Sequence, residues 1–195
     1  MRKLTLADIK DMRDYERERD EFRRHIIELK KRRRISLGTI MTLVFENRDT
    51  MRFQVQEMAR AERMLRDEQI AHEIATYNAL IPEPGELSAT LLVELQSEEQ
   101  LREWLPKLVG IHERVAIVLF DGSEVRGVAE DADRLTREDT TPAVHFLKFR
   151  FLPEQVGAFA KGRARIVVDH PSYREEVELT DAQREELLHD LRADD

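Results

Sequence analysis

The sequence predicts an α+β protein with antiparallel strand pairing, helices packed on one side of the sheet and a long helix near the N-terminus. Three observations support this class. Residues 6–33 contain neither Gly nor Pro and repeat apolar side chains at helical spacing. Short β-branched or alternating segments follow, which is typical of half-buried strands. Two later stretches, residues 87–130 and 143–179, share the order strand, helix, strand, strand.

The first element is an amphipathic helix over residues 6–33. Arg19 stands where a further apolar side chain would fall, so the first half of the helix is expected to pack less tightly or to meet a partner chain. We favour a helix that lies across its own domain. The apolar residues recur in steps of three, four and seven: Ile9, Met12, Tyr15, Phe22, Ile26 and Leu29.

Residues 39–56 predict a β-hairpin. The segment 39–46 is rich in β-branched and aromatic residues, and Asn47, Arg48 and Asp49 carry a turn signal. A second strand with one apolar and one polar face is then expected. The apolar side chains of that strand are Met51, Phe53 and Val55, and the polar ones are Arg52, Gln54 and Gln56.

A helical segment over residues 58–81 follows and ends at Pro82, Pro84 and Gly85. This boundary divides the chain into residues 1–85 and 86–195, which we expect to form one compact unit. In the second part, the two strand-helix-strand-strand stretches suggest an internal repeat, with helices at 97–105 and 153–161. A connection over residues 131–142 is expected to be an exposed loop, and a final helix spans 181–192.

The composition restricts the class of protein. The chain has 195 residues, of which 41% are hydrophobic and 37% are charged, and its net charge is -8. Cysteine is absent, which excludes disulfides, thiolate metal sites and Cys nucleophiles. No apolar run reaches the roughly 20 residues that cross a bilayer, and the N-terminus lacks the apolar region of a secretory signal. We therefore expect a soluble, cytoplasmic protein.

The polar face of the predicted hairpin is the first candidate site. Arg52, Gln54 and Gln56 would form a row able to hold a carboxylate or phosphate, and a solvated sheet face is the alternative. Further polar groups stand at the turn and at the far end of the row: Glu46, Arg48, Asp49 and Glu57.

Histidines at strand ends form the second candidate. His145 and His170 both fall on apolar strand faces, and Asp169 is adjacent to His170. These groups could bind a divalent metal or relay protons, whereas two buried histidines satisfied by backbone carbonyls are the favoured alternative. Elsewhere, Glu68 and His72 lie one helical turn apart. The Glu-x-x-His pattern of diiron proteins requires a glutamate three residues before the histidine, and Gln69 occupies that position.

The run from Lys30 to Arg34, KKRRR, is the third candidate. Five consecutive cations could grip the phosphates of RNA. The preceding acids favour an ion-paired helix instead, namely Glu16, Glu18, Glu21 and Glu28, and the net negative charge argues against nucleic-acid binding.

The motifs FENRDTMRFQVQEMARAER, YNALIP, PGELSAT, VHFL and VDHPSY resemble a bacterial family known as domain of unknown function 3501. The resemblance covers nearly the whole chain and carries no assigned catalytic residues. It implies a genetic setting near rubrerythrin-type non-haem iron proteins and an iron-sulfur oxidoreductase, and so an oxidative-stress or electron-transfer role. No cofactor is specified.

Three functions follow as hypotheses. The first is a non-catalytic accessory protein for that redox system, with the rubrerythrin-like protein and the iron-sulfur oxidoreductase as partners. The second is a small metal-dependent or anion-binding enzyme that uses His145, His170 and Asp169 or the Arg52 row. The third is an RNA-associated factor that acts through residues 30–34. The sequence favours the first.

Overall fold

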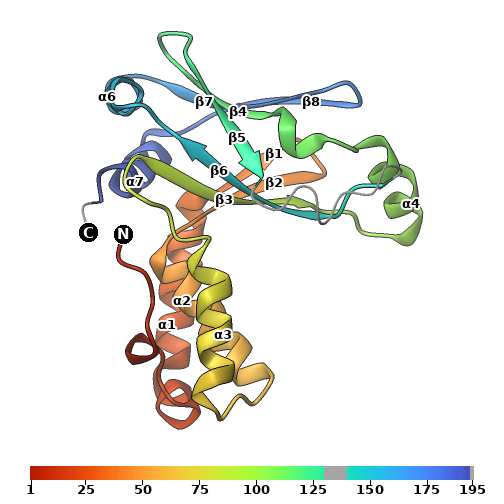
Figure 1. Cartoon of the computed structure of the whole chain (residues 1–195). Helices are drawn as coiled ribbons and strands as arrows, with labels where there is room; N and C mark the ends of the chain where they lie inside the picture. The colour runs from red at the N-terminus through yellow and green to blue at the C-terminus, as the bar shows by residue number, and fades with distance from the viewer. Residues whose placement is uncertain (130–139, 194–195) are drawn as a thin grey trace.

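The computed structural model describes residues 1–129 and 140–193, and it places three helices in a stalk that projects from a curved sheet (Figure 1). The stalk helices pack against one another in chain order. They are α1 (Met12–Arg33), α2 (Arg48–Ala61) and α3 (Asp67–Asn78), and the 3-10 turn η1 (Leu6–Asp8) precedes them. None of the helices in these residues is long and apolar enough to cross a membrane.

The described sheet has eight strands, and every neighbouring pair is antiparallel. Its order is β1-β2-β3-β6-β5-β4-β7-β8. The strands are β1 (Arg34–Leu37), β2 (Met41–Glu46), β3 (Glu86–Val93), β4 (Val115–Leu119), β5 (Glu124–Ala129), β6 (Val144–Arg150), β7 (Ala164–His170) and β8 (Tyr173–Glu178).

The sheet curls until its two edge strands nearly meet. The Tyr173 hydroxyl, at the start of β8, donates a hydrogen bond of 2.5 Å to the carbonyl of Leu37, at the end of β1. Gly38 follows in a left-handed conformation with φ of 70°, and a Cβ there would overlap the same hydroxyl. Glycine is therefore required at this turn, both for its backbone angle and for the close approach of β8.

The remaining helices lie around the sheet: α4 (Glu98–Lys107), the 3-10 turn η2 (Ile111–Arg114), α6 (Pro153–Lys161) and α7 (Asp181–Arg192). Their starts follow the sequence signals, because Ser97 and Thr180 each cap a helix and Pro153 occupies a first helical position. The main core lies inside the curled sheet and includes Phe45 and Phe149. A smaller apolar cluster in the stalk includes Met51 and Val55.

The predicted α+β class and antiparallel pairing are confirmed, as is the order strand, helix, strand, strand in both later stretches. Two pairs of corresponding strands are neighbours in the described sheet, since β3 pairs with β6 and β4 pairs with β7. The third pair, β5 and β8, is not adjacent, because β5 pairs with β6 and β8 lies at the edge beside β7. The internal repeat therefore stays a prediction. The predicted parts 1–85 and 86–195 share one sheet, because β2 pairs with β3.

The prediction of a hairpin over residues 39–56 is wrong. β2 pairs with β1, and the chain turns into helix α2 at Arg48. The Asn47 side chain accepts a hydrogen bond of 3.0 Å from the Thr50 backbone N–H, and the Thr50 hydroxyl accepts one of 2.9 Å from the Asn47 N–H. This reciprocal cap starts a helix at residues that resemble a turn signal. Met51 and Val55 are then buried four residues apart, on one helical face.

The start of the N-terminal helix differs from the prediction. The N-terminal helix begins at Met12 rather than at residue 6, because the Asp11 carboxylate accepts hydrogen bonds from the backbone N–H groups of Arg13 and Asp14. Residues 130–139, most of the predicted loop 131–142, lie outside the described residues.

Candidate functional site

The helical conformation of α2 disperses the predicted Arg52 row. The Arg52 guanidinium carbon lies 4.3 Å from the centroid of the Phe22 ring on α1. The Gln56 amide holds the Lys10 backbone through hydrogen bonds of 3.0 and 2.8 Å. Gln54 alone faces a surface groove, described below. These three side chains therefore do not form one anion-binding row.

Glu57 joins α2 to α1. Its carboxylate accepts two hydrogen bonds from the Arg19 guanidinium, at 2.8 and 2.9 Å, and one of 2.7 Å from the Tyr15 hydroxyl. The Arg19 hydrogen bond lowers the pKa of Glu57, and Tyr15 adds to that effect. The Arg19 position that interrupts the apolar stripe is thus used to bind α2 within the same chain.

Arg48 and Asp49 also hold stalk elements together. The Arg48 guanidinium lies 2.5 Å from the Asp8 carboxylate and donates to the Arg2 carbonyl at 3.1 Å. Burial opposes the ionisation of Asp8, but hydrogen bonds from the Thr5 backbone and from Arg48 outweigh it and lower the pKa of Asp8 to about 2. Asp49 lies 3.7 Å from His25 of α1. Arg48 is therefore structural, and Asp49 lies beside α1 at the surface of the stalk.

The structure does not bring His145, His170 and Asp169 together. His145 lies on β6 and His170 on β7, and these strands are separated by β5 and β4. His170 contacts the Val109 carbonyl at 3.0 Å, and exposed Asp169 pairs with Arg174 at 3.0 Å. Among the described residues no group of three or more His, Asp and Glu side chains could hold a metal.

A different histidine accompanies His145. His112 of η2 stacks on it with ring centroids 5.3 Å apart, and both rings are buried. Burial, and then the neighbouring His112, lower the pKa of His145 to about 4. The Thr141 hydroxyl lies 3.1 Å from the His145 Nε2 atom. The sequence around His112 carries no pattern that predicts this pairing.

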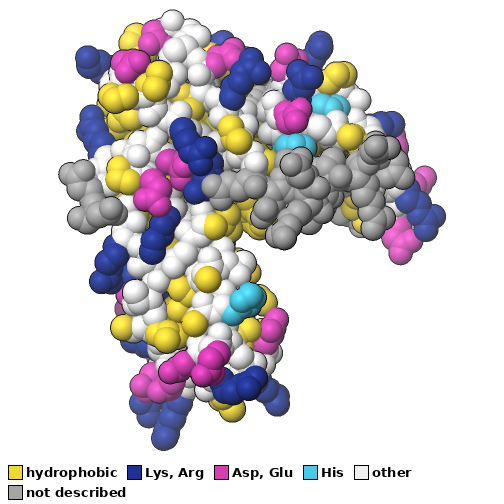
Figure 2. Space-filling view, in the orientation of Figure 1, with side chains coloured by type: hydrophobic (Ala, Val, Ile, Leu, Met, Phe, Trp, Pro, Cys, Tyr) yellow, Lys and Arg dark blue, Asp and Glu magenta, His cyan; other side chains and the backbone are white. Residues whose placement is uncertain are grey.

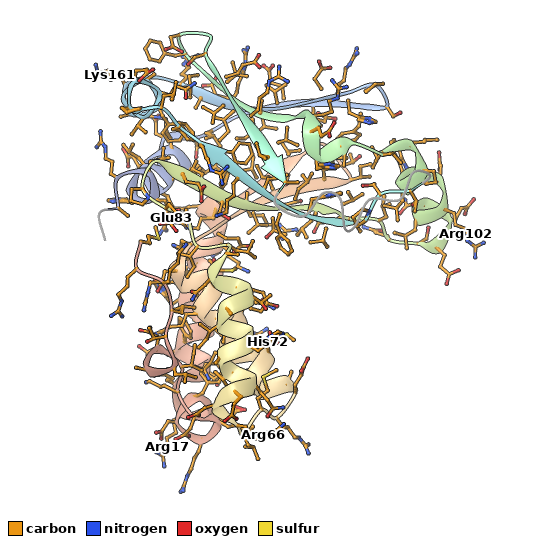
Figure 3. All side chains as sticks on the ribbon, viewed as in Figure 1. Arg17, Arg66, His72, Glu83, Arg102 and Lys161 are labelled. Carbon is orange, nitrogen blue, oxygen red and sulfur yellow. The ribbon has the colours of Figure 1, made fainter. Side chains whose placement is uncertain are left out.

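The acids and histidine of α3 do not form a site. His72 is exposed and points away from α1 and α2 (Figure 3). Glu68 is exposed as well.

The basic run is largely ion-paired. Arg32 and Arg33 both contact Glu186 of α7, at 2.9 Å each, and Arg33 also pairs with Asp190. Lys31 pairs with Glu28 at 2.6 Å, and Arg34 pairs with Glu94. Within the part of the chain that the structure describes, the Lys30 ammonium has no salt bridge or hydrogen bond. The basic run, predicted as a phosphate-binding surface, therefore contributes mainly to the contact between α1 and α7.

A groove of about 310 Å³ lies where the stalk meets the sheet. Figure 2 shows hydrophobic side chains in the angle between the two. Strands β2, β3 and β6 contribute the floor, the ends of α1, α2 and α3 contribute the walls, and Lys30 and Arg34 also reach the groove. The floor residues are Val44, Glu46, Thr90, Leu92 and Phe146, and the wall residues include Met51, Gln54, Tyr77 and Leu80.

Glu46 is the one acid among the described residues of this groove, and only 6% of it is exposed. Its Oε1 atom accepts a hydrogen bond of 2.9 Å from the Thr90 hydroxyl. Its Oε2 atom is buried and has no hydrogen-bond partner in the described protein. Burial of a carboxylate oxygen without a partner is unfavourable, and native proteins seldom leave it so. The groove therefore has a built-in acceptor for a donor group.

The sequence identifies Glu46 as a candidate for a different reason, namely its position beside the predicted turn. The other groove residues come from segments distant in sequence, and only the contact between the stalk and the sheet brings them together. Lys30 belongs to the basic run, but its role beside a groove has no signal of its own in the sequence.

Comparison with known proteins places the whole chain in one family. No curated protein matches. A crystal structure described as a novel protein of unknown function from Burkholderia pseudomallei is similar over 97% of this chain and 100% of that one. The TM-score is 0.90 and the sequence identity 31%. Residues 3–191 match the family described as protein of unknown function (DUF3501), and the chain belongs to this family.

Proposed function

We propose that this chain is a cytoplasmic binding protein, with an accessory role, that takes a small ligand in the groove between the stalk and the sheet. The observation that carries the proposal is the buried Glu46 Oε2 atom without a partner. A donor group of a ligand would satisfy this oxygen.

The size and lining of the groove support a small-molecule ligand. Its volume of about 310 Å³ falls at the lower end of the range for ligand sites. Apolar side chains from both the stalk and the sheet would contact the body of a ligand, while a few polar groups fix its orientation. Because the groove spans two parts of the fold, a bound ligand would also fix the stalk against the sheet.

Binding suits this groove better than catalysis does. General acid-base chemistry usually pairs two titratable groups with different pKa values, or uses a histidine. Glu46 is the one acid in the described groove, and His112 and His145 lie outside its lining. We therefore assign recognition to the groove and no reaction.

The accessory role comes from the setting that the family resemblance implies. We propose that a rubrerythrin-like non-haem iron protein and an iron-sulfur oxidoreductase are the partners. Affinity purification from a host lysate tests this part. Recovery of either protein would support the partnership. Recovery of neither would contradict the partnership but would not bear on ligand binding in the groove.

A thermal-shift screen of a fragment library tests the groove itself. We expect fragments that raise the melting temperature of the native protein and lose this effect in Leu92→Arg, which places a long cation on the groove floor. Val128→Arg is the matched control, because Val128 is an exposed apolar residue of β5 that does not line the groove. Fragments that act equally on the native protein and on Leu92→Arg would overturn the proposal.

A further inference from the structure

A second buried polar atom beside Glu46 indicates which chemical class of ligand the groove would bind. Ser88 stands directly opposite Glu46 in the pairing of β2 with β3. Directly opposite residues project from the same face of an antiparallel sheet, with Cβ atoms about 5 Å apart. Ser88 is only 1% exposed, and its Oγ atom also has no hydrogen-bond partner among the described residues. Two neighbouring polar groups thus lack partners, and one of them, Glu46, lines the groove while Ser88 lies buried beside it.

The lysine on the other side of Ser88 forms an ion pair with a different acid. Lys148 of β6 stands opposite Ser88 on its other side. Its ammonium pairs with the Glu86 carboxylate at 2.9 Å, and both side chains are buried. No described donor, Lys148 included, forms a hydrogen bond with the Glu46 Oε2 atom or with the Ser88 Oγ atom.

One donor cannot serve both atoms, whereas a primary ammonium group has three N–H donors. Such a group, placed between the two side chains, would reach the Glu46 carboxylate and the Ser88 hydroxyl together. The bond to Glu46 would be charge-assisted, which makes it stronger than a bond between neutral groups. A single amide N–H of a ligand would leave one of the two protein atoms without a partner, and a ligand hydroxyl could contact both but would bring no positive charge to the carboxylate.

Lys30 supplies the opposite charge. Its ammonium lines the same groove and has no ion pair within the described chain, whereas the charge of Arg34 is balanced by Glu94. A ligand that carried only a cation would be repelled by Lys30, and one that carried only an anion would be repelled by buried Glu46. A ligand with both charges complements both residues.

We propose that the groove binds a small zwitterion with an apolar body, whose primary ammonium contacts Glu46 and Ser88 and whose anionic group contacts Lys30. This inference rests on the proposed function, because it specifies the ligand of the same groove. The apolar side chains between the two charged ends, among them Leu92 and Phe146, contact the body of the ligand.

Three probes of equal chain length separate these contributions: ε-aminohexanoate carries both charges, hexylamine only the cation and hexanoate only the anion. Isothermal titration calorimetry of the full chain is expected to give the tightest binding for ε-aminohexanoate. Hexylamine is expected to bind about tenfold more weakly, as the loss of one charged contact implies, and hexanoate more weakly still. Equal affinity for all three probes would overturn the proposal.

Variants assign each contact. Glu46→Gln is expected to weaken the binding of ε-aminohexanoate by about tenfold or more, and Ser88→Ala is expected to weaken it by a smaller factor. The affinity for hexanoate should not change in Ser88→Ala. Lys30→Gln is expected to abolish the advantage of ε-aminohexanoate over hexylamine. Glu98→Gln is the control, because exposed Glu98 of α4 does not line the groove, and it is expected to leave the order of the three probes intact. If Glu46→Gln or Lys30→Gln preserves that order, the assigned contacts are wrong.

Failure of this inference is distinguishable from failure of the proposed function. Some fragments without an ammonium group could bind the native protein and fail to bind Leu92→Arg. That result would support the groove as a binding site but would refute the proposal that its ligand is a zwitterion. Absence of any fragment sensitive to Leu92→Arg would refute both.

Discussion

Arg33 and Asp190 form a buried ion pair that fastens the end of α1 to α7. Two hydrogen bonds of 2.6 and 2.9 Å join the guanidinium to the carboxylate, and the side chains are 1% and 2% exposed. Glu186 adds a contact of 2.9 Å to the same guanidinium. The stalk is therefore joined to the sheet domain by charges that are removed from solvent.

Arg33→Met is expected to lower the free energy of unfolding by about 3 to 5 kcal/mol, because Asp190 would stay buried without its partner. The double variant Arg33→Met with Asp190→Leu is expected to recover most of that loss, since well-packed apolar residues often replace a buried pair with little penalty. Urea denaturation measures both. A double variant no more stable than the single one would show that the pair is not the source of the loss.

Asn47→Ala is expected to destabilise the protein by about 1 kcal/mol, because the Thr50 N–H at the start of α2 would lose its cap. Thermal unfolding of Asn47→Ala beside Asn47→Ser measures this, and the serine hydroxyl of the second variant should retain much of the cap. If both substitutions proved equally harmful, capping would not explain the start of α2.

Acid is expected to destabilise the fold through His145. Its pKa in the folded protein is about 4, below the ordinary value of 6.5, so the unfolded chain binds the proton more readily. The contribution of neutral His145 is complete above pH 6.5 and is lost as the pH falls toward 4, with a total of about 3 kcal/mol. His145→Phe should flatten this dependence in denaturation measured across pH, whereas His72→Gln, at an exposed position, should not. An unchanged slope in His145→Phe would contradict the assignment.

Glu46→Gln is expected to stabilise the protein by about 1 to 3 kcal/mol, because it removes a buried charge without a partner while Thr90 keeps its acceptor. Glu94→Gln is the matched control. Glu94 accepts hydrogen bonds from Thr42 and Arg34, and these lower the pKa of its carboxyl, so its neutralisation should reduce stability. Loss of stability in both variants would mean that Glu46 is structural rather than reserved for a ligand.

The sequence predicts the parts of the fold that local interactions determine, but not those that depend on tertiary contact. Ser97, Pro153 and Thr180 mark helix starts by local hydrogen bonding or backbone geometry, and all three do so in the structure. The ENRDTMRFQVQE segment misleads because Asn47 and Asp49 suit a turn as well as a helix cap. Met51, Phe53 and Val55 alternate like a strand, but Met51 and Val55 also suit one face of a helix.

The candidate site is predictable only in part. Glu46 is a sequence candidate, yet its partners in the groove come from α1, α3 and β6, and no local pattern indicates that these segments meet. Arg19 and Glu57 illustrate the same point, since their bidentate contact spans two helices. The His145 and His112 stack likewise requires the sheet to place η2 beside β6.

Amide chemical shifts would show, residue by residue, whether the Glu46 groove binds a ligand. The ¹H-¹⁵N spectrum of the full chain would be recorded with ε-aminohexanoate and with fragment hits, for the native protein and for Glu46→Gln. We expect saturable shifts concentrated at four residues, namely Val44, Glu46, Ser88 and Leu92. The affinity obtained from these shifts is expected to be about tenfold or more weaker in Glu46→Gln. Shifts confined to other surfaces, or equal titrations of the two proteins, would contradict it.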